Sequence, residues 1–181
     1  MKENLLLPIL IVGAGSAITL VTMGVRMLLG YYPQAAFSTL ISWSSWYFFY
    51  PFLEWGFFSG VIYIISLSFS GMGSFRATLQ NIGYGLFPWT LSTVIELVIT
   101  VLFFKKPQLI YYDLLQTPQF VNGIIFLLFM IWTCYLWVFA IKSTHQISQR
   151  KAVGSVLLLV IIYFLTMYAL TFARILLFPA S

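Results

Sequence analysis

Long apolar stretches dominate the chain, and short polar or glycine-rich segments separate them. Because a helix needs about 20 apolar residues to cross the hydrocarbon core of a bilayer, each stretch is long enough to span a membrane. The last stretch, SVLLLVIIYFLTMYALTF, does not alternate apolar and polar positions as a membrane β-barrel strand would. The pattern predicts one all-α, polytopic membrane domain over residues 1–181, with transmembrane helices at about residues 5–25, 51–69, 78–104, 121–141 and 152–178.

The segment at about residues 34–50 has a different pattern. Gln34, Ser38, Ser42 and Ser45 recur at helical spacing, which leaves the apolar side chains on the opposite face. The same segment is rich in tryptophan and tyrosine, which are favoured at membrane interfaces. We expect an amphipathic helix that lies along the interface before the second span. A short sixth span is the alternative, and the sequence leaves this choice open.

The break between the second and third spans begins the sequence GMGSFRATLQNIGYGLFPWTL. Its glycines favour a tight turn, and we expect Arg76 to lie at the headgroups of the inner leaflet. Pro88 has no backbone N–H, so it should bend the third span. Gly83 and Gly85 should let a neighbouring helix approach closely. Small residues one helical turn apart favour the same kind of packing, and they form the pairs Gly13/Ala17 and Gly56/Gly60.

Composition and charge agree with a membrane protein. Hydrophobic residues make up 61% of the chain and charged residues 7%, whereas a soluble domain carries about 25% charged residues. The net charge of +5 is spread over loops and span ends, so it lacks the clustered basic face of a nucleic-acid-binding protein. Lipid headgroups are the expected partners of these cations. The basic loop KSTHQISQRK favours a cytoplasmic N-terminus and an external C-terminus under the positive-inside rule.

Side chains suited to catalysis or metal binding are few. The chain has one histidine, one cysteine and four carboxylates, well separated in the sequence, whereas a metal site needs three or four converging ligands. We therefore expect no metal, no cofactor and no enzymatic activity. His145 is expected in a polar loop at the headgroup level, with pH sensing or partner contact as alternatives. Cys134 is expected to pack as a small hydrophobic residue.

Glu96 lies inside the third span, at a depth of about 12 Å for a rise of 1.5 Å per residue. A carboxylate at such a depth is costly and commonly faces the bundle interior or a wet cavity. The same span carries a polar stripe, made by Asn81, Tyr84, Pro88, Ser92 and Thr100. Glu96 could pin helices together, line a pathway for an ion or substrate, or contact a lipid or partner. We hypothesise a pair between Arg26 or Arg174 and either Glu54 or Glu96.

Two segments resemble a known membrane family. The sequence GMGSFRATLQNIGYGLFP is similar to the glycine-rich Ser-Phe-Arg turn and the Gly-Tyr-x-Leu-x-Pro start of a span in the Ypt/Rab-interacting (Yip) domain family. The sequence IWTCYLWVFAIKSTHQISQRKAVGSVLL is similar to that family's fourth span, basic loop and alanine-led fifth span. Both segments occur in the family's order, and with the five spans the resemblance covers residues 51 to about 170.

The resemblance implies a non-catalytic membrane organiser or interaction protein, in membrane trafficking or assembly. Family members of eukaryotic secretory membranes carry a long hydrophilic N-terminal region and associate with prenylated Rab-type GTPases. Here MKEN precedes the first span, so we expect a short prokaryotic-type member of the cytoplasmic membrane rather than a partner of a small GTPase. The expected partners are lipids, other membrane proteins or a second copy, contacted through Arg76, Lys142 and His145.

Two other kinds of function remain open from the sequence. The first is a small channel or transporter with a polar pathway along the third span, and the second is an accessory subunit of a larger membrane complex. The many aromatic residues do not separate these functions, since lipid-facing and partner-facing aromatics look alike in a sequence.

Overall fold

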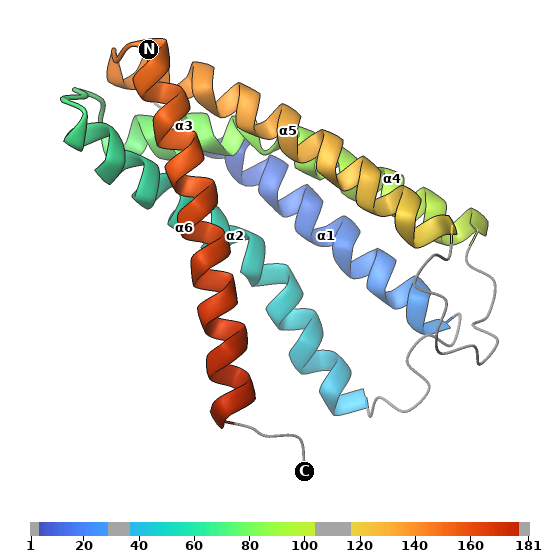
Figure 1. Ribbon diagram of the computed structural model, residues 1–181. Coiled ribbons are helices and arrows are strands. Elements are labelled where there is room, and N and C mark those ends of the chain that lie inside the picture. The colour runs from blue at the N-terminus through green and yellow to red at the C-terminus, as the bar shows by residue number, and fades with distance from the viewer. Residues whose placement is uncertain (1–3, 29–36, 104–116, 178–181) are drawn as a thin grey trace.

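Helices form all the regular secondary structure in the part of the chain that the computed structural model describes, which is residues 4–28, 37–103 and 117–177 (Figure 1). They are α1 (Leu6–Leu28), α2 (Phe37–Ser68), α3 (Phe75–Gly85), α4 (Phe87–Phe103), α5 (Thr117–His145) and α6 (Gln149–Leu177). Helices α3 and α4 together make one of five segments that are long and apolar enough to cross a membrane. The predicted all-α fold with five membrane-spanning helices is confirmed.

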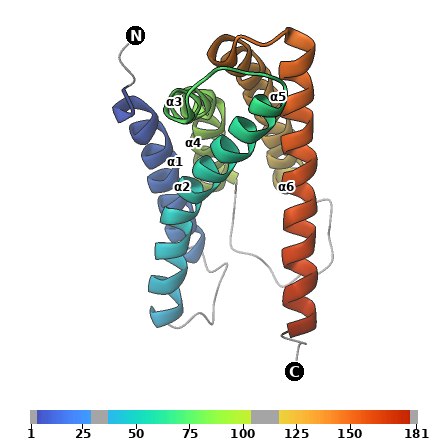
Figure 2. The ribbon, with the colours of Figure 1, turned by 90° about the vertical axis from the view of Figure 1, so that its left-hand side faces the viewer.

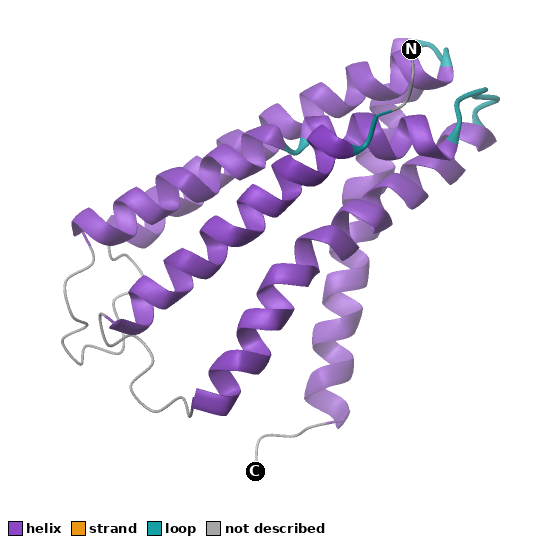
Figure 3. Ribbon diagram, turned by 180° about the vertical axis from the view of Figure 1, so that it is seen from behind, coloured by secondary structure: helices purple, strands orange, loops and turns teal. Residues whose placement is uncertain are grey.

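The membrane-spanning segments alternate in direction (Figure 3). The start of α1, the α2–α3 loop and the α5–α6 loop share one end, which we call the loop end. There the backbone amide of Asn4 donates to Oε1 of Gln80 at 3.0 Å. The amide of Met72 donates to the carbonyl of His145 at 3.2 Å. These bonds join the start of α1 to α3 and the α2–α3 loop to the end of α5.

The core lies between α1, α2, α3 and α5, and α6 covers one side of it. Within the described residues α6 packs on α2 and α5 alone (Figure 2). Buried apolar side chains include Val12, Ile62 and Ile82, whereas large ones such as Leu127 and Phe164 face outward. Outward-facing apolar side chains are what a bilayer requires, because lipid tails solvate them as well as a protein core does.

Helix α2 corrects the expectation for residues 34–50. We expected an interfacial helix there and a separate span from about residue 51, but Phe37–Ser68 is one continuous helix. Pro51 lies inside this helix and is buried. A proline removes one hydrogen bond, and the other hydrogen bonds of the helix, which lipid cannot replace, keep it continuous. The candidate span within this helix includes Ser44–Ser68, and residues 34–36 lie outside the described part of the chain.

The third span is interrupted at Leu86, two residues before Pro88. Pro88 has no N–H to donate to the carbonyl of Tyr84. The amide of Leu86 bonds instead to the carbonyls of Gly83 and Tyr84, which closes α3. The amide of Thr90 then bonds to the carbonyl of Leu86 at 3.0 Å, so a new helix begins. The expected disturbance by Pro88 is present as this break.

Two glycines of α3 let neighbouring side chains approach its backbone. A Cβ atom at Gly83 would lie 2.6 Å from Cβ of Pro8 and 2.9 Å from Nε1 of Trp55. At Gly85 it would collide with the indole of Trp137. Both indoles need this space because each donates its N–H to an α3 carbonyl: Trp55 to Leu79 at 2.8 Å and Trp137 to Ile82 at 3.0 Å.

The small-residue pairs of the other helices behave differently. No atom of the described residues would lie within 4 Å of a Cβ at Gly56 or Gly60. At Gly13 the nearest atom, Cζ of Phe52, would be at an ordinary contact distance of 3.7 Å, and Ala17 is exposed. The expected close packing through Gly56/Gly60 is therefore absent among the described residues, because that face of α2 points away from the other helices.

Candidate functional site

At the loop end, His145 holds the α2–α3 loop against the last turn of α5. Its side chain is 1% exposed, and its Nε2 lies 2.8 Å from the hydroxyl of Thr78. Next to it, Asn81 donates to the hydroxyl of Thr144 at 2.6 Å. A Cβ at Gly73 would lie 2.8 Å from Nδ1 of His145. The loop follows the imidazole so closely that no larger residue fits at this position without movement.

The loop owes its shape to defined helix ends. Ser70 adopts a left-handed φ of 64°, and the amide of Gly71 bonds to the carbonyl of Ser66 at 2.9 Å. This bond closes the end of α2 in a Schellman-type motif. Ser74 then caps the start of α3 by accepting the amide of Ala77 at 3.1 Å, as serine commonly does at a helix N-terminus. Few residues of this turn are therefore free to change conformation.

Basic side chains surround this fixed turn. Arg76, Lys142 and Arg150 are exposed, and Lys151 donates to the carbonyl of Phe69 at 3.1 Å. An ammonium group is favoured there because the C-terminus of α2 carries a partial negative charge. We call Arg76, Lys142, Arg150 and Lys151 the basic platform.

The structure corrects the expected setting of His145. We expected a polar loop residue at the headgroup level, but His145 is the last residue of α5, and its imidazole is enclosed by the α2–α3 loop and by Tyr63, whose ring centroid lies 6.0 Å away. Asn81 and Tyr84, expected on one polar stripe with Glu96, point to different neighbours: Asn81 to α5, and Tyr84 to Gln80 on the same helix. The polar stripe is therefore not continuous along the span.

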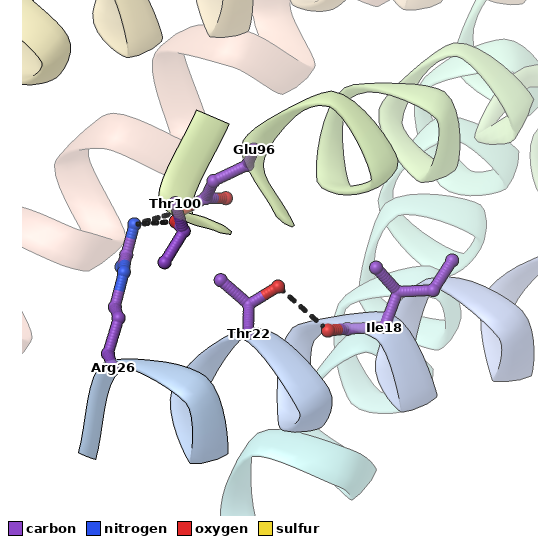
Figure 4. Close-up of polar contacts among 5 residues, drawn as sticks. All are labelled: Ile18, Thr22, Arg26, Glu96 and Thr100. Atoms are coloured by element: carbon purple, nitrogen blue, oxygen red, sulfur yellow. Dashed lines mark hydrogen bonds and ion pairs between the residues drawn. The ribbon is translucent and has the colours of Figure 1, made fainter. Parts of the chain in front are cut away.

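The hypothesis of a counter-charge for Glu96 is confirmed for Arg26 (Figure 4). Nη2 of Arg26 lies 2.7 Å from Oε1 of Glu96 and 3.5 Å from the hydroxyl of Thr100. The side chain of Arg26 is 25% exposed and that of Glu96 41%. Thr22, which lies nearby, donates instead to the carbonyl of Ile18 at 2.9 Å. The pair joins the end of α1 to α4.

Glu96 also borders a hollow of about 270 Å³ between α4 and α5, together with Ser92, Gly123, Ile125 and Phe126. The hydroxyl of Ser92 donates to the carbonyl of Trp89 on its own helix, at 2.7 Å. The hollow therefore presents one charged group to its surroundings, and Arg26 already neutralises that group.

Sequence reasoning did not identify a second polar cluster inside the bundle. The hydroxyl of Tyr163 on α6 donates to Oε1 of Glu54 on α2 at 2.7 Å, and Tyr50 makes a further side-chain hydrogen bond to the same carboxylate. An acidic residue within an apolar stretch is the signal that singled out Glu96, and it applies equally to Glu54. Nothing in the sequence indicates that Tyr163 is the partner of Glu54.

No group of three or more histidine, cysteine, aspartate or glutamate side chains within the described residues is placed to hold a metal ion. Cys134 is partly buried and has no disulfide partner.

Comparison with known proteins identifies the family to which the chain belongs. Neither the curated proteins nor the solved structures gave a match. The family model described as the Yip1 domain matches residues 1–170 of the chain. This match includes the α2–α3 turn, the break before Pro88 and the α5–α6 loop, whose geometry is described above. Since it extends over nearly the whole sequence, the protein belongs to the Yip1 domain family.

Proposed function

We propose that this multi-pass membrane protein acts without catalysis, by binding another membrane protein through the basic platform at its loop end. One observation supports the proposal above all: the buried contact of His145 on α5 with Thr78 on α3 joins the two helices that carry Lys142 and Arg76 of the platform. Exposed charges on a rigid base can recognise a partner by position, because little conformational entropy is lost on binding.

The charge of this end favours an acidic partner. The two described acidic side chains, Glu54 and Glu96, lie elsewhere: Glu54 precedes the end of α2 by about 20 Å at 1.5 Å per residue, and Glu96 pairs with Arg26 on α1. Among the side chains that the structure describes, the charged groups at the loop end are therefore all positive, and so is their field. Anionic lipid headgroups compete for it, since each cation near an anionic membrane surface is worth about 1 kcal/mol.

We propose further that the loop end faces the cytoplasm, as the positive-inside rule predicts for its basic loops. In a Cys134→Ala background, Ser148→Cys should stay unlabelled by an impermeant thiol reagent outside sealed right-side-out vesicles, and it should label after permeabilisation. Leu28→Cys, at the opposite end of α1 and 89% exposed, should label from outside. Labelling of both positions from the same side would contradict the alternating arrangement, and an exchanged pattern would reverse the orientation.

The partner-binding proposal is tested by moving one charge. Lys142→Ser should lower the recovery of cross-linked partners from native membranes by about tenfold, because interface energy concentrates in a few residues. Adding Ser143→Lys restores the net charge one position away, at another exposed residue. We expect that this double variant will not restore recovery. His145 is left unchanged, because its substitution would disturb the loop itself.

Two outcomes would contradict the proposal. If the shifted lysine restores recovery fully, the platform acts as a general electrostatic anchor for anionic lipids. If Lys142→Ser and Arg76→Ser both leave recovery unchanged, the partner binds elsewhere. Equal expression and equal elution of wild type and variants in mild detergent provide the control for folding.

A second candidate function is a small channel or transporter, which the hollow beside Glu96 favours. The ion pair with Arg26 argues against it, because a carboxylate that already has a counter-charge attracts a permeating cation weakly. The variants of this pair that are described in the Discussion separate the two functions.

A further inference from the structure

A half-enclosed pocket lies at mid-depth in the bundle, where α2, α4, α5 and α6 meet. Its volume is about 100 Å³, which is smaller than an apolar cavity that holds benzene, so an occupant would extend through the open side. The lining is mostly apolar and is rich in aromatic rings. The residues that matter for recognition are Glu54, Phe58, Trp89, Thr133, Trp137 and Tyr163.

Glu54 brings an ionisable carboxyl group into this apolar pocket. Its carboxylate accepts hydrogen bonds from the phenols of Tyr163 and Tyr50, which are neutral groups. Among the side chains that the structure describes, the one salt bridge is between Arg26 and Glu96, so Glu54 has no counter-charge there. An ionisable residue at this depth is costly and marks a functional site by default. A cation is the partner that would offset the cost.

Thr133 points independently to a ligand. It is 5% exposed, it lines the pocket, and its Oγ1 has no hydrogen-bond partner. Other buried threonines of the bundle have partners: Thr22 and Thr93 donate to carbonyls of their own helices, and Thr90 donates to the carbonyl of Ile11 on α1. A buried hydroxyl without a partner is rare and calls for a missing donor or acceptor. An ammonium group supplies donors for both this oxygen and the carboxylate.

The aromatic lining completes the chemistry. Phe58, Trp89 and Trp137 border the pocket, and Trp137 is held in place by its bond to the carbonyl of Ile82. Rings attract an organic ammonium ion through their electron-rich faces and also bind its apolar body. We propose that this pocket binds a small amphipathic organic ammonium ion, with its charged nitrogen facing Glu54 and Thr133 and its apolar part against the rings. The site is separate from the basic platform and does not depend on the function proposed for it.

The test compares two probes of nearly equal shape, 2-phenylethylammonium and the neutral 2-phenylethanol. Radiolabelled probe is titrated onto the full-length protein in phosphatidylcholine nanodiscs, with empty nanodiscs as the background. We expect saturable binding of the ammonium probe. The alcohol should bind at least about thirtyfold more weakly, because it leaves the buried carboxylate unpaired.

Three variants then locate the site. Glu54→Gln should weaken binding of the ammonium probe by about thirtyfold or more and leave the weak binding of the alcohol unchanged. Thr133→Val keeps the shape and removes the unpartnered hydroxyl, so it should weaken binding by about threefold to tenfold. Glu96→Gln removes a carboxylate outside the pocket and serves as the matched control, with unchanged binding expected.

Several results would overturn the proposal. They are absence of saturable binding of the ammonium probe to the wild type, equal binding of the alcohol, and equal losses in Glu54→Gln and Glu96→Gln. The comparison of the two probes uses the wild type alone, so it decides the question even if Glu54→Gln does not fold. Retained ammonium binding in a well-folded Glu54→Gln protein would show that the carboxylate is not the recognition group.

Discussion

Gly85→Ala is expected to destabilise the protein severely. The new Cβ would collide with the indole of Trp137, with Nε1 at 2.5 Å. Trp137 is 5% exposed and packs on Phe58 with ring centroids 5.3 Å apart, so it has little room to rotate. Its bond to the carbonyl of Ile82 would also be lost. Overpacking costs about 1–3 kcal/mol and a lost buried hydrogen bond about 1 kcal/mol more.

Gly56→Ala is the matched control for this prediction. The same methyl group is added inside a helix, but no described atom lies within 4 Å of it. Alanine is favoured over glycine in a helix by about 1 kcal/mol, so the control should be neutral or slightly stabilised. Denaturant unfolding in a mild detergent, followed by loss of helical circular dichroism, measures both variants. Equal stability of Gly85→Ala and Gly56→Ala would mean that Trp137 does not pack against α3 as described.

Breaking the pair between Arg26 and Glu96 should have the second large effect. Arg26→Gln leaves the Glu96 carboxylate near the end of α4 without its cation. The hydroxyl of Thr100 lies 3.5 Å from Nη2 of Arg26, so it contributes little to holding Arg26 in place. Each single variant should lose about 2 kcal/mol of unfolding free energy. This loss is smaller than the roughly 3–5 kcal/mol lost when one partner of a fully buried ion pair is removed, because the Glu96 side chain is 41% exposed. The exchange Arg26→Glu with Glu96→Arg should recover most of the loss.

The same variants test whether Glu96 lines a pathway. If it pins α1 to α4, reconstituted wild type should show no flux of common cations, anions or small amines that depends on Glu96, and the charge exchange should restore stability. A pH- or ion-dependent flux that Glu96→Gln abolishes and the exchanged pair fails to restore would favour the channel or transporter instead. Failure of the exchange to recover any stability would contradict the ion pair.

The sequence by itself determined that the chain crosses the membrane several times, that Pro88 disturbs the third span and that Glu96 is costly inside it. These properties depend on short stretches: whether about 20 residues are apolar enough to cross a bilayer, and whether a proline lacks a hydrogen-bond donor. The sequence left open whether Arg26 or Arg174 is the counter-charge of Glu96. Within the second span, the local signals of serine, aromatic residues and Pro51 favoured two elements. The structure has one helix there, because backbone groups surrounded by lipid must bond within the helix.

The tertiary structure alone decided which side chains meet. His145 contacts Thr78 across 67 positions, Arg26 contacts Glu96 across 70, and Tyr163 contacts Glu54 across 109. Such contacts depend on the rotation and relative height of each helix about its axis. Hydrophobic periodicity fixes these only where one face is polar, and helices surrounded by lipid are apolar on nearly every face. The burial of His145, the contact of Gly85 with Trp137 and the pocket beside Glu54 therefore emerged only when the helices were assembled.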